Sequence, residues 1–130
     1  MSQENVEVAR KVNEAVRRGD WDVVAAYYDP DVSIRTDPRW PEQRMYGRNA
    51  AMKFVRDACE AWGIDVRIEE IVDLGDRLLI RMHWNTHARH TGIGGDFRYS
   101  EIVTYRDGRA ILVEFFLEHE QALKAVGLEE

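Results

Sequence analysis

The residue that most clearly could do chemistry is Glu101, in the segment FRYSEIVTY. If this segment is a strand, alternate residues share one face of a sheet. The face that carries Glu101 is the more apolar and aromatic one, and its members are Phe97, Tyr99, Glu101, Val103 and Tyr105. A carboxyl group in such surroundings is desolvated, so its pKa rises and it can act as a general acid, a general base or a neutral hydrogen-bond donor. The alternative is a structural pair with Arg81 or His83 on the neighbouring strand.

A second carboxyl group, Asp37, lies at the end of an expected short strand and directly before Pro38. Asp-Pro is common in turns, so a turn residue is one interpretation. The other is a second carboxylate at the mouth of a cavity, near Trp40 in the following loop. Two carboxylates in different environments can divide the acid and base roles between them.

Nucleophilic and metal chemistry have little support. Ser2, Ser33 and Ser100 lie outside any G-x-S-x-G context, and the single Cys59 fits a buried helix position and excludes an internal disulfide. The segment GIGGD lies between two expected strands, which favours a hairpin over a phosphate loop.

The histidines do not have metal-ligand spacing. On a strand, His83 and His87 share a face but lie about 13 Å apart, too far to bind one metal ion. His90 points to the other face or lies in a loop. We therefore predict no metal and no cofactor, and expect that one strand histidine could face a cavity as an acid or base.

The charge balance limits the partners. The 130 residues carry 18 basic and 24 acidic side chains, a net charge of −6, and the basic residues are scattered. This excludes an electrostatic basis for binding nucleic acid or an anionic membrane. No apolar run reaches the ~20 residues needed to cross a bilayer, and the first residues are polar and acidic, unlike a signal peptide. We expect a cytoplasmic protein whose partner is a small hydrophobic molecule.

The elements that must position these residues follow from periodicity. Helical spacing predicts helices at about residues 3–18, 21–28, 51–62 and 118–126. A short strand is expected at 31–37, a loop through PRWPEQRMYG, and a four-strand antiparallel meander from 64 to 117. This order indicates one α+β domain spanning 1–130. Three short helices cannot fill the concave face of so long a sheet, so we expect a cavity at its open end.

The last expected strand suggests a partner surface. Its outward set contains Glu114 and Phe116. An exposed aromatic beside charges suits an interface, and a symmetric homodimer is the expectation. A solvated face with one isolated Phe is the alternative.

Several segments resemble SnoaL-like proteins of the nuclear transport factor 2-like (NTF2-like) superfamily. The similarity is carried by the G-D before the second helix, the D-P-D-V, the G-R before the third helix and the D-G-R hairpin, in that order. The resemblance implies a cone in which a curved antiparallel sheet wraps three N-terminal helices around a ligand cavity, with dimerisation through the outer sheet face. The superfamily includes polyketide cyclases, ketosteroid isomerases, epoxide hydrolases, dehydratases and non-catalytic binding modules.

The resemblance also assigns roles. Glu101 falls where the cyclases carry an acid/base aspartate and the isomerases a protonated oxyanion-hole aspartate, and Asp37 falls where the isomerases carry their proton-abstracting aspartate. The sequence departs from these patterns at Val12, near the place of the isomerases' oxyanion tyrosine, and at Phe115, near a carboxylate of the epoxide hydrolases. Glu101 is also one methylene longer than aspartate.

Together these observations predict a small-molecule pocket that catalyses cofactor-independent acid/base chemistry on a hydrophobic cyclic or carbonyl-bearing substrate. The alternative is a non-catalytic dimeric binding or accessory module. Besides the two carboxyl groups, the candidate substrate-binding residues are Tyr28, Trp40, Trp62, His83, Tyr99 and Phe115.

Overall fold

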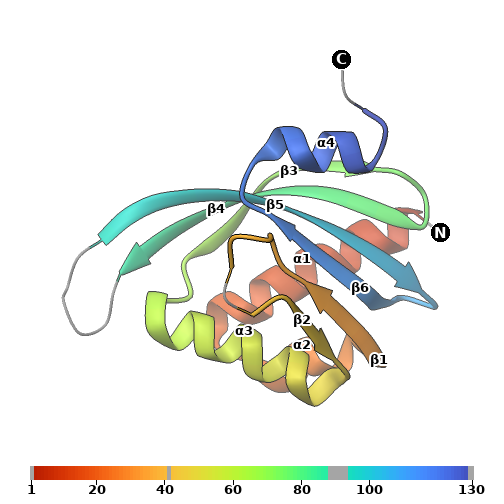
Figure 1. The fold of residues 1–130 in the computed structure, drawn as a ribbon. Helices are drawn as coiled ribbons and strands as arrows, with labels where there is room; N and C mark the ends of the chain where they lie inside the picture. Colours follow the sequence, from red (N-terminus) through yellow and green to blue (C-terminus); the bar gives the residue numbers. More distant parts are fainter. Residues whose placement is uncertain (1, 41, 88–93, 129–130) are drawn as a thin grey trace.

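The computed structural model describes residues 2–40, 42–87 and 94–128, and shows an α+β fold with a curved sheet between helices (Figure 1). The helices are α1 (Ser2–Arg18), α2 (Trp21–Ala26), α3 (Arg48–Trp62) and α4 (His119–Ala125). The strands are β1 (Tyr28–Arg35), β2 (Arg44–Tyr46), β3 (Val66–Asp73), β4 (Arg77–His87), β5 (Gly94–Arg106) and β6 (Arg109–Phe116).

The helix boundaries follow local signals in the sequence. Helix α1 ends at Gly19, whose φ of 69° is one that glycine adopts without strain. The Asp20 side chain then accepts a hydrogen bond from the Val23 amide and caps α2. Helix α3 ends in the same way at Gly63, with φ 96°. The three expected N-terminal helices and the C-terminal helix are therefore confirmed.

The sheet has the strand order β2-β1-β6-β5-β4-β3. The expected antiparallel meander is confirmed in β3, β4, β5 and β6. The sheet is not antiparallel throughout, because β1 pairs with β6 in parallel. This correction concerns a pairing between segments about 80 residues apart, which local periodicity does not encode.

Two expectations about the N-terminal half were wrong. The segment expected to be an unpaired loop contains β2, which pairs with β1 and buries Met45 opposite Ile34. The first strand begins at Tyr28 instead of residue 31, so Tyr28 belongs to the sheet and not to α2. Pairing with β6, which reaches Tyr28 opposite Ala110, outweighs the helical spacing of Tyr28.

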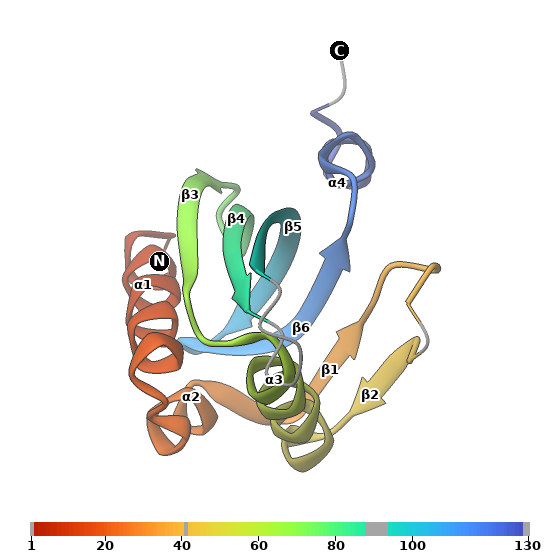
Figure 2. The same ribbon diagram turned by 90° about the vertical axis from the view of Figure 1, so that its left-hand side faces the viewer.

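The helices lie on both sides of the sheet. Helices α1, α2 and α3 lie on the concave side, and α4 lies on the opposite side (Figures 1 and 2). The main core is between the three helices and the sheet. On the outer face, Ala122 of α4 is fully buried against Leu79 and Ile102.

The outer face differs from the expected partner surface. Phe116 is half-buried and packs against the α4 cluster, so it is not an isolated exposed aromatic. The cause is α4, which follows Phe116 closely and folds back over the sheet. The homodimer itself stays a prediction.

Candidate functional site

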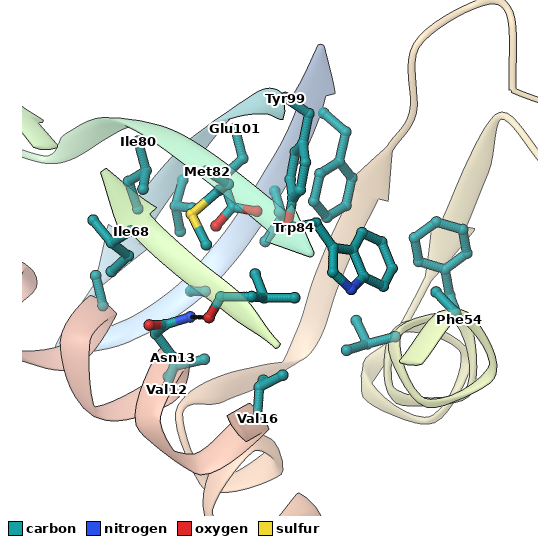
Figure 3. Close-up of a pocket in the computed structure, with 18 of the residues that line it drawn as sticks. Val12, Asn13, Val16, Phe54, Ile68, Ile80, Met82, Trp84, Tyr99 and Glu101 are labelled. Atoms are coloured by element: carbon teal, nitrogen blue, oxygen red, sulfur yellow. Dashed lines mark hydrogen bonds between the residues drawn. The ribbon is translucent and has the colours of Figure 1, made fainter. Parts of the chain in front are cut away.

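A pocket of about 150 Å³ lies between the concave face of the sheet and the helices (Figure 3). Its walls come from α1, α3 and all strands except β2. Apolar and aromatic side chains make up most of the lining, and no Lys, Arg or His is part of it among the described residues. A dry cavity of this volume holds a molecule about the size of benzene.

Glu101 points into this pocket from β5, beside Met82 and Tyr99 (Figure 3). Its strand neighbours are Ile80 and Phe115. The side chain is half-buried, and its remaining accessible surface faces the pocket. Burial raises the pKa of Glu101 from 4.5 to about 7, because its apolar surroundings disfavour the charged form.

The structural pair considered for Glu101 does not form. Arg81 lies opposite Ser100, and His83 lies opposite Arg98, so both belong to the outer face of the sheet. Within the described parts of the chain, the Glu101 carboxyl group has no ion pair or hydrogen bond. Among the residues that the structure describes, it is thus a carboxyl group in an apolar pocket with no compensating cation.

Three tyrosines surround Glu101. Burial raises the pKa of each phenol, and the negative charge of Glu101 raises it further, for Tyr28 on β1 and for Tyr99 and Tyr105 on β5. The three phenols therefore stay protonated at neutral pH and lie within electrostatic reach of the carboxyl group. All three line the pocket, and each phenol can donate a hydrogen bond to an oxygen atom of a bound molecule.

Four aromatic rings form a continuous wall of the pocket. Trp40 contacts Phe54 edge-on, with ring centroids 6.5 Å apart, and Phe54 contacts Phe115 at 6.0 Å. Phe115 in turn lies 5.8 Å from Tyr99. Such a wall binds planar or cyclic apolar molecules through ring contacts.

Asp37 also lines the pocket, but its carboxylate is fully engaged. Its Oδ1 accepts hydrogen bonds from the Arg39 amide (3.0 Å) and Nε (2.9 Å), and its Oδ2 from Arg39 Nη2 (3.1 Å) and the Leu117 amide (3.0 Å). Although Asp37 is only 6% exposed, these bonds hold its pKa far below the ordinary value, Arg39 having the largest effect. Asp37 is therefore a permanent carboxylate and a weak base.

Four of the six predicted binding residues line the pocket with the two carboxyl groups: Tyr28, Trp40, Tyr99 and Phe115. The other two lie outside this lining. Trp62, at the end of α3, is 44% exposed and lies outside the lining. His83 lies on the outer face, where its Nε2 is 3.0 Å from Asp96 Oδ1. The His87 side chain and His90 lie outside the described residues.

Sequence reasoning did not assign a role to several lining residues, among them Asn13, Phe54, Trp84, Phe97 and Tyr105. Trp84 could have been found from strand register, because it pairs with Phe97 on the face that carries Glu101. Asn13 had no such signal. It lines the pocket from α1 and donates a hydrogen bond to the Val66 carbonyl at 2.9 Å (Figure 3).

Two other kinds of site have no support in the described ranges. No three His, Cys, Asp or Glu side chains there are grouped closely enough to hold a metal ion. Burial raises the pKa of Cys59, which lines the pocket, to about 11, so its thiol is a poor nucleophile at neutral pH. No helix in these ranges has the length and apolar character that crossing a membrane requires.

Solved structures with the same architecture cover nearly the whole chain. A candidate SnoaL-like polyketide cyclase from Jannaschia sp. CCS1 is 17% identical, with a TM-score of 0.78 over 98% of this chain and 94% of that one. A candidate isomerase from Bacillus subtilis is 16% identical, with a TM-score of 0.78 over 98% and 95%. An NTF2-like protein of unknown function from Burkholderia pseudomallei K96243 is 20% identical, with a TM-score of 0.75 over 93% and 95%. At these identities the likeness shows the fold alone.

Sequence comparison gives the family. No functionally curated protein matches the chain significantly. The model of the SnoaL-like domain matches residues 9–113, a range that begins in α1 and ends in β6 and includes both Asp37 and Glu101. The chain therefore belongs to the SnoaL-like domain family and has the NTF2-like fold.

Proposed function

We propose that this protein is a cofactor-independent acid/base enzyme of the cyclase or isomerase type, acting on a small hydrophobic molecule that is cyclic or carbonyl-bearing. Glu101 moves the proton. The observation that carries the proposal is the position of Glu101 in an apolar, ring-lined pocket, without a cationic neighbour among the described residues. A pKa of about 7 lets one carboxyl group both accept and return a proton near neutral pH.

The surroundings of Glu101 suit proton transfer at a carbon atom next to a carbonyl group. The ionised carboxylate removes the proton, and the electron pair moves onto the carbonyl oxygen as an enolate forms. A phenol of Tyr28, Tyr99 or Tyr105 can donate a hydrogen bond to that oxygen, since all three lie near Glu101. Protonated Glu101 then returns the proton to another atom of the same molecule, so the reaction needs no further reagent.

The Asp37 carboxylate already accepts four hydrogen bonds within the protein, and this favours a second candidate function, a non-catalytic binding module. The four hydrogen bonds to Asp37 leave Glu101 as the uncommitted carboxyl group of the described lining. A pocket with one such group can bind a neutral molecule without reacting with it. The experiment below separates the two functions.

The test uses cyclohexanone in D₂O, because a six-membered ring suits the pocket volume and its α-protons exchange visibly in proton NMR. The wild type is expected to accelerate exchange, with a rate that rises with pH and levels off above about 7 as Glu101 ionises. Glu101→Gln removes the base and is expected to lower the rate by ~10²–10⁴-fold.

Glu114→Gln is the matched control. Glu114 lies on β6 opposite Ile102, on the outer face of the same sheet, and should leave exchange unchanged. If cyclohexanone shifts pocket resonances but the wild type exchanges no faster than buffer, the protein is a binding module. If the ketone does not bind at all, the assigned substrate class is wrong.

A further inference from the structure

The buried Asp37 carboxylate joins two chain segments that line the pocket. A carboxylate can accept about four hydrogen bonds, and Asp37 accepts four. Three come from Arg39, two residues away, and one comes from the amide of Leu117, 80 residues away. To take a proton from a substrate, this group would first have to lose these bonds. Its geometry therefore suits holding the chain in place.

One of the joined segments is the turn that carries Trp40. The Trp40 amide donates to the Asp37 carbonyl at 2.8 Å, and the Arg39 amide donates to the Asp37 side chain at 3.0 Å. The Asp37 residue thus closes the turn with both its backbone and its side chain. This turn sets the position of the Trp40 ring, which packs against Phe54 and forms part of the pocket lining.

The other segment leads from β6 into α4. Leu117 follows β6 directly and lines the pocket. Glu118 places its Oε2 3.8 Å from Arg39 Nη2. His119, the first residue of α4, places its Nδ1 2.7 Å from the hydroxyl of buried Ser100 on the outer face. Residues 117–119 are thus held from the pocket side by Asp37 and from the outer side by Ser100.

We propose that Asp37 is a positioning residue that clasps the Trp40 turn to the start of α4 and so holds this part of the pocket wall in place around the ligand. The sequence predicts a catalytic base at this position. In this proposal the Asp37 carboxylate instead binds Arg39 and the Leu117 amide and has a mechanical role. An intact wall limits the access of water to Glu101 and slows the escape of a bound molecule. The catalytic part of this role rests on the proposed function, whereas the mechanical part does not.

Asp37→Asn tests the clasp, because one acceptor oxygen becomes an NH₂ group that faces the donors of Arg39 or Leu117. Amide exchange at Arg39, Trp40 and Leu117 is expected to accelerate by about tenfold or more, the change that loss of a charge-assisted hydrogen bond produces. The pKa of Glu101, from carboxyl carbon NMR, is expected to fall from about 7 toward 4.5 as water enters. The dissociation constant of cyclohexanone should rise.

Asp29→Asn is the matched control, because it alters another Asp–Arg pair near the opposite end of β1, Asp29 with Arg106 at 3.2 Å. Asp29 does not belong to the pocket lining, so its variant should leave the amide exchange of Arg39, Trp40 and Leu117 and the Glu101 pKa unchanged. Arg39→Gln is the second variant and keeps the carboxylate at position 37. It is expected to loosen the turn in the same direction as Asp37→Asn, and it carries the test if Asp37→Asn fails to fold.

The outcomes separate the two roles of Asp37. If Asp37 were a catalytic base, Asp37→Asn would abolish proton exchange of the ketone but leave amide exchange, the Glu101 pKa and ligand affinity unchanged. Arg39→Gln would then retain proton exchange of the ketone. That pattern would overturn the clasp. Amide exchange and the Glu101 pKa need no substrate, so they test the clasp even if the wild type catalyses nothing.

Discussion

Glu101 makes the stability of this fold depend on pH in a direction opposite to that of a paired carboxylate. Its pKa is about 7 in the folded chain against 4.5 for an ordinary glutamate, so the folded state holds a proton that the unfolded chain releases. The stability that Glu101 contributes is complete below about pH 4.5 and is lost as pH rises to about 7. The loss is at most ~3 kcal/mol. Burial of this acid therefore costs stability at neutral pH.

This dependence can be measured by urea unfolding at pH 5 and pH 8. Between these values the wild type should lose up to ~3 kcal/mol of unfolding free energy relative to Glu101→Gln, because the amide cannot ionise. Other groups titrate equally in both proteins and cancel in the difference. Parallel pH profiles for the two proteins would show that Glu101 has an ordinary pKa and would remove the basis of the proposed mechanism.

Asp37 has the reverse dependence, because its bonds lower the pKa. Its contribution to stability is present above the ordinary aspartate value of 3.8 and is lost as pH falls below it. The two carboxyl groups therefore titrate in separate windows, and a pH profile can resolve them.

Helix α4 has seven residues and is too short to be stable alone, so its stability comes from docking on the sheet. Ala122 is fully buried there, and His119 is hydrogen-bonded to Ser100, which is 1% exposed. We expect Ser100→Ala to weaken this docking by ~1 kcal/mol, since it deletes the hydroxyl partner of His119.

Hydrogen exchange checks this prediction. The amides of α4 should exchange about fivefold faster in Ser100→Ala, whereas those of the central strand β5 should be unaffected. Thr104→Ala, on the same face of β5, is the control and lies away from His119 in the register. Equal exchange of α4 in both variants and the wild type would show that packing around Ala122 alone holds the helix.

The charge of the protein and the chemistry of the pocket together select against anions. The chain carries a net charge of −6, and no cationic side chain lines the pocket in the described ranges. An anionic ligand would meet the charge of ionised Glu101 in a poorly solvated site. At pH 8 we expect benzamide to bind about tenfold or more tightly than benzoate, which has nearly the same shape.

The comparison uses NMR titration of the pocket resonances. In Glu101→Gln the preference for benzamide should shrink, because the repelling charge is gone. A wild type that binds benzoate as tightly as benzamide would reveal a cation that the described lining does not contain.

The parts of the fold with local periodicity could be predicted from the sequence. The meander and the face of Glu101 follow from alternation with period two, and the ends of the helices follow from Gly19 and Gly63. The parallel pairing of β1 with β6 and the presence of β2 could not, because each depends on contacts between segments that local pattern does not connect.

The same distinction applies to the site. The apolar surroundings of Glu101 were visible in its own strand. The outward position of His83 could have been read from register, because His83 pairs with Arg98 and not with a residue on the Glu101 face. The hydrogen bonding of the Asp37 carboxylate could not have been predicted from the sequence, because one of its partners is the backbone amide of residue 117.

The parallel pairing of β1 with β6 also limits the order of folding during synthesis. Residues 28–35 leave the ribosome early, but their partner strand, residues 109–116, emerges about 80 residues later. Closing so long a loop is slow, and until then one edge of β1 is without its neighbour. The Leu117 amide that Asp37 binds emerges later still. The part of the pocket wall that Asp37 holds together therefore cannot form before residue 117 has left the ribosome.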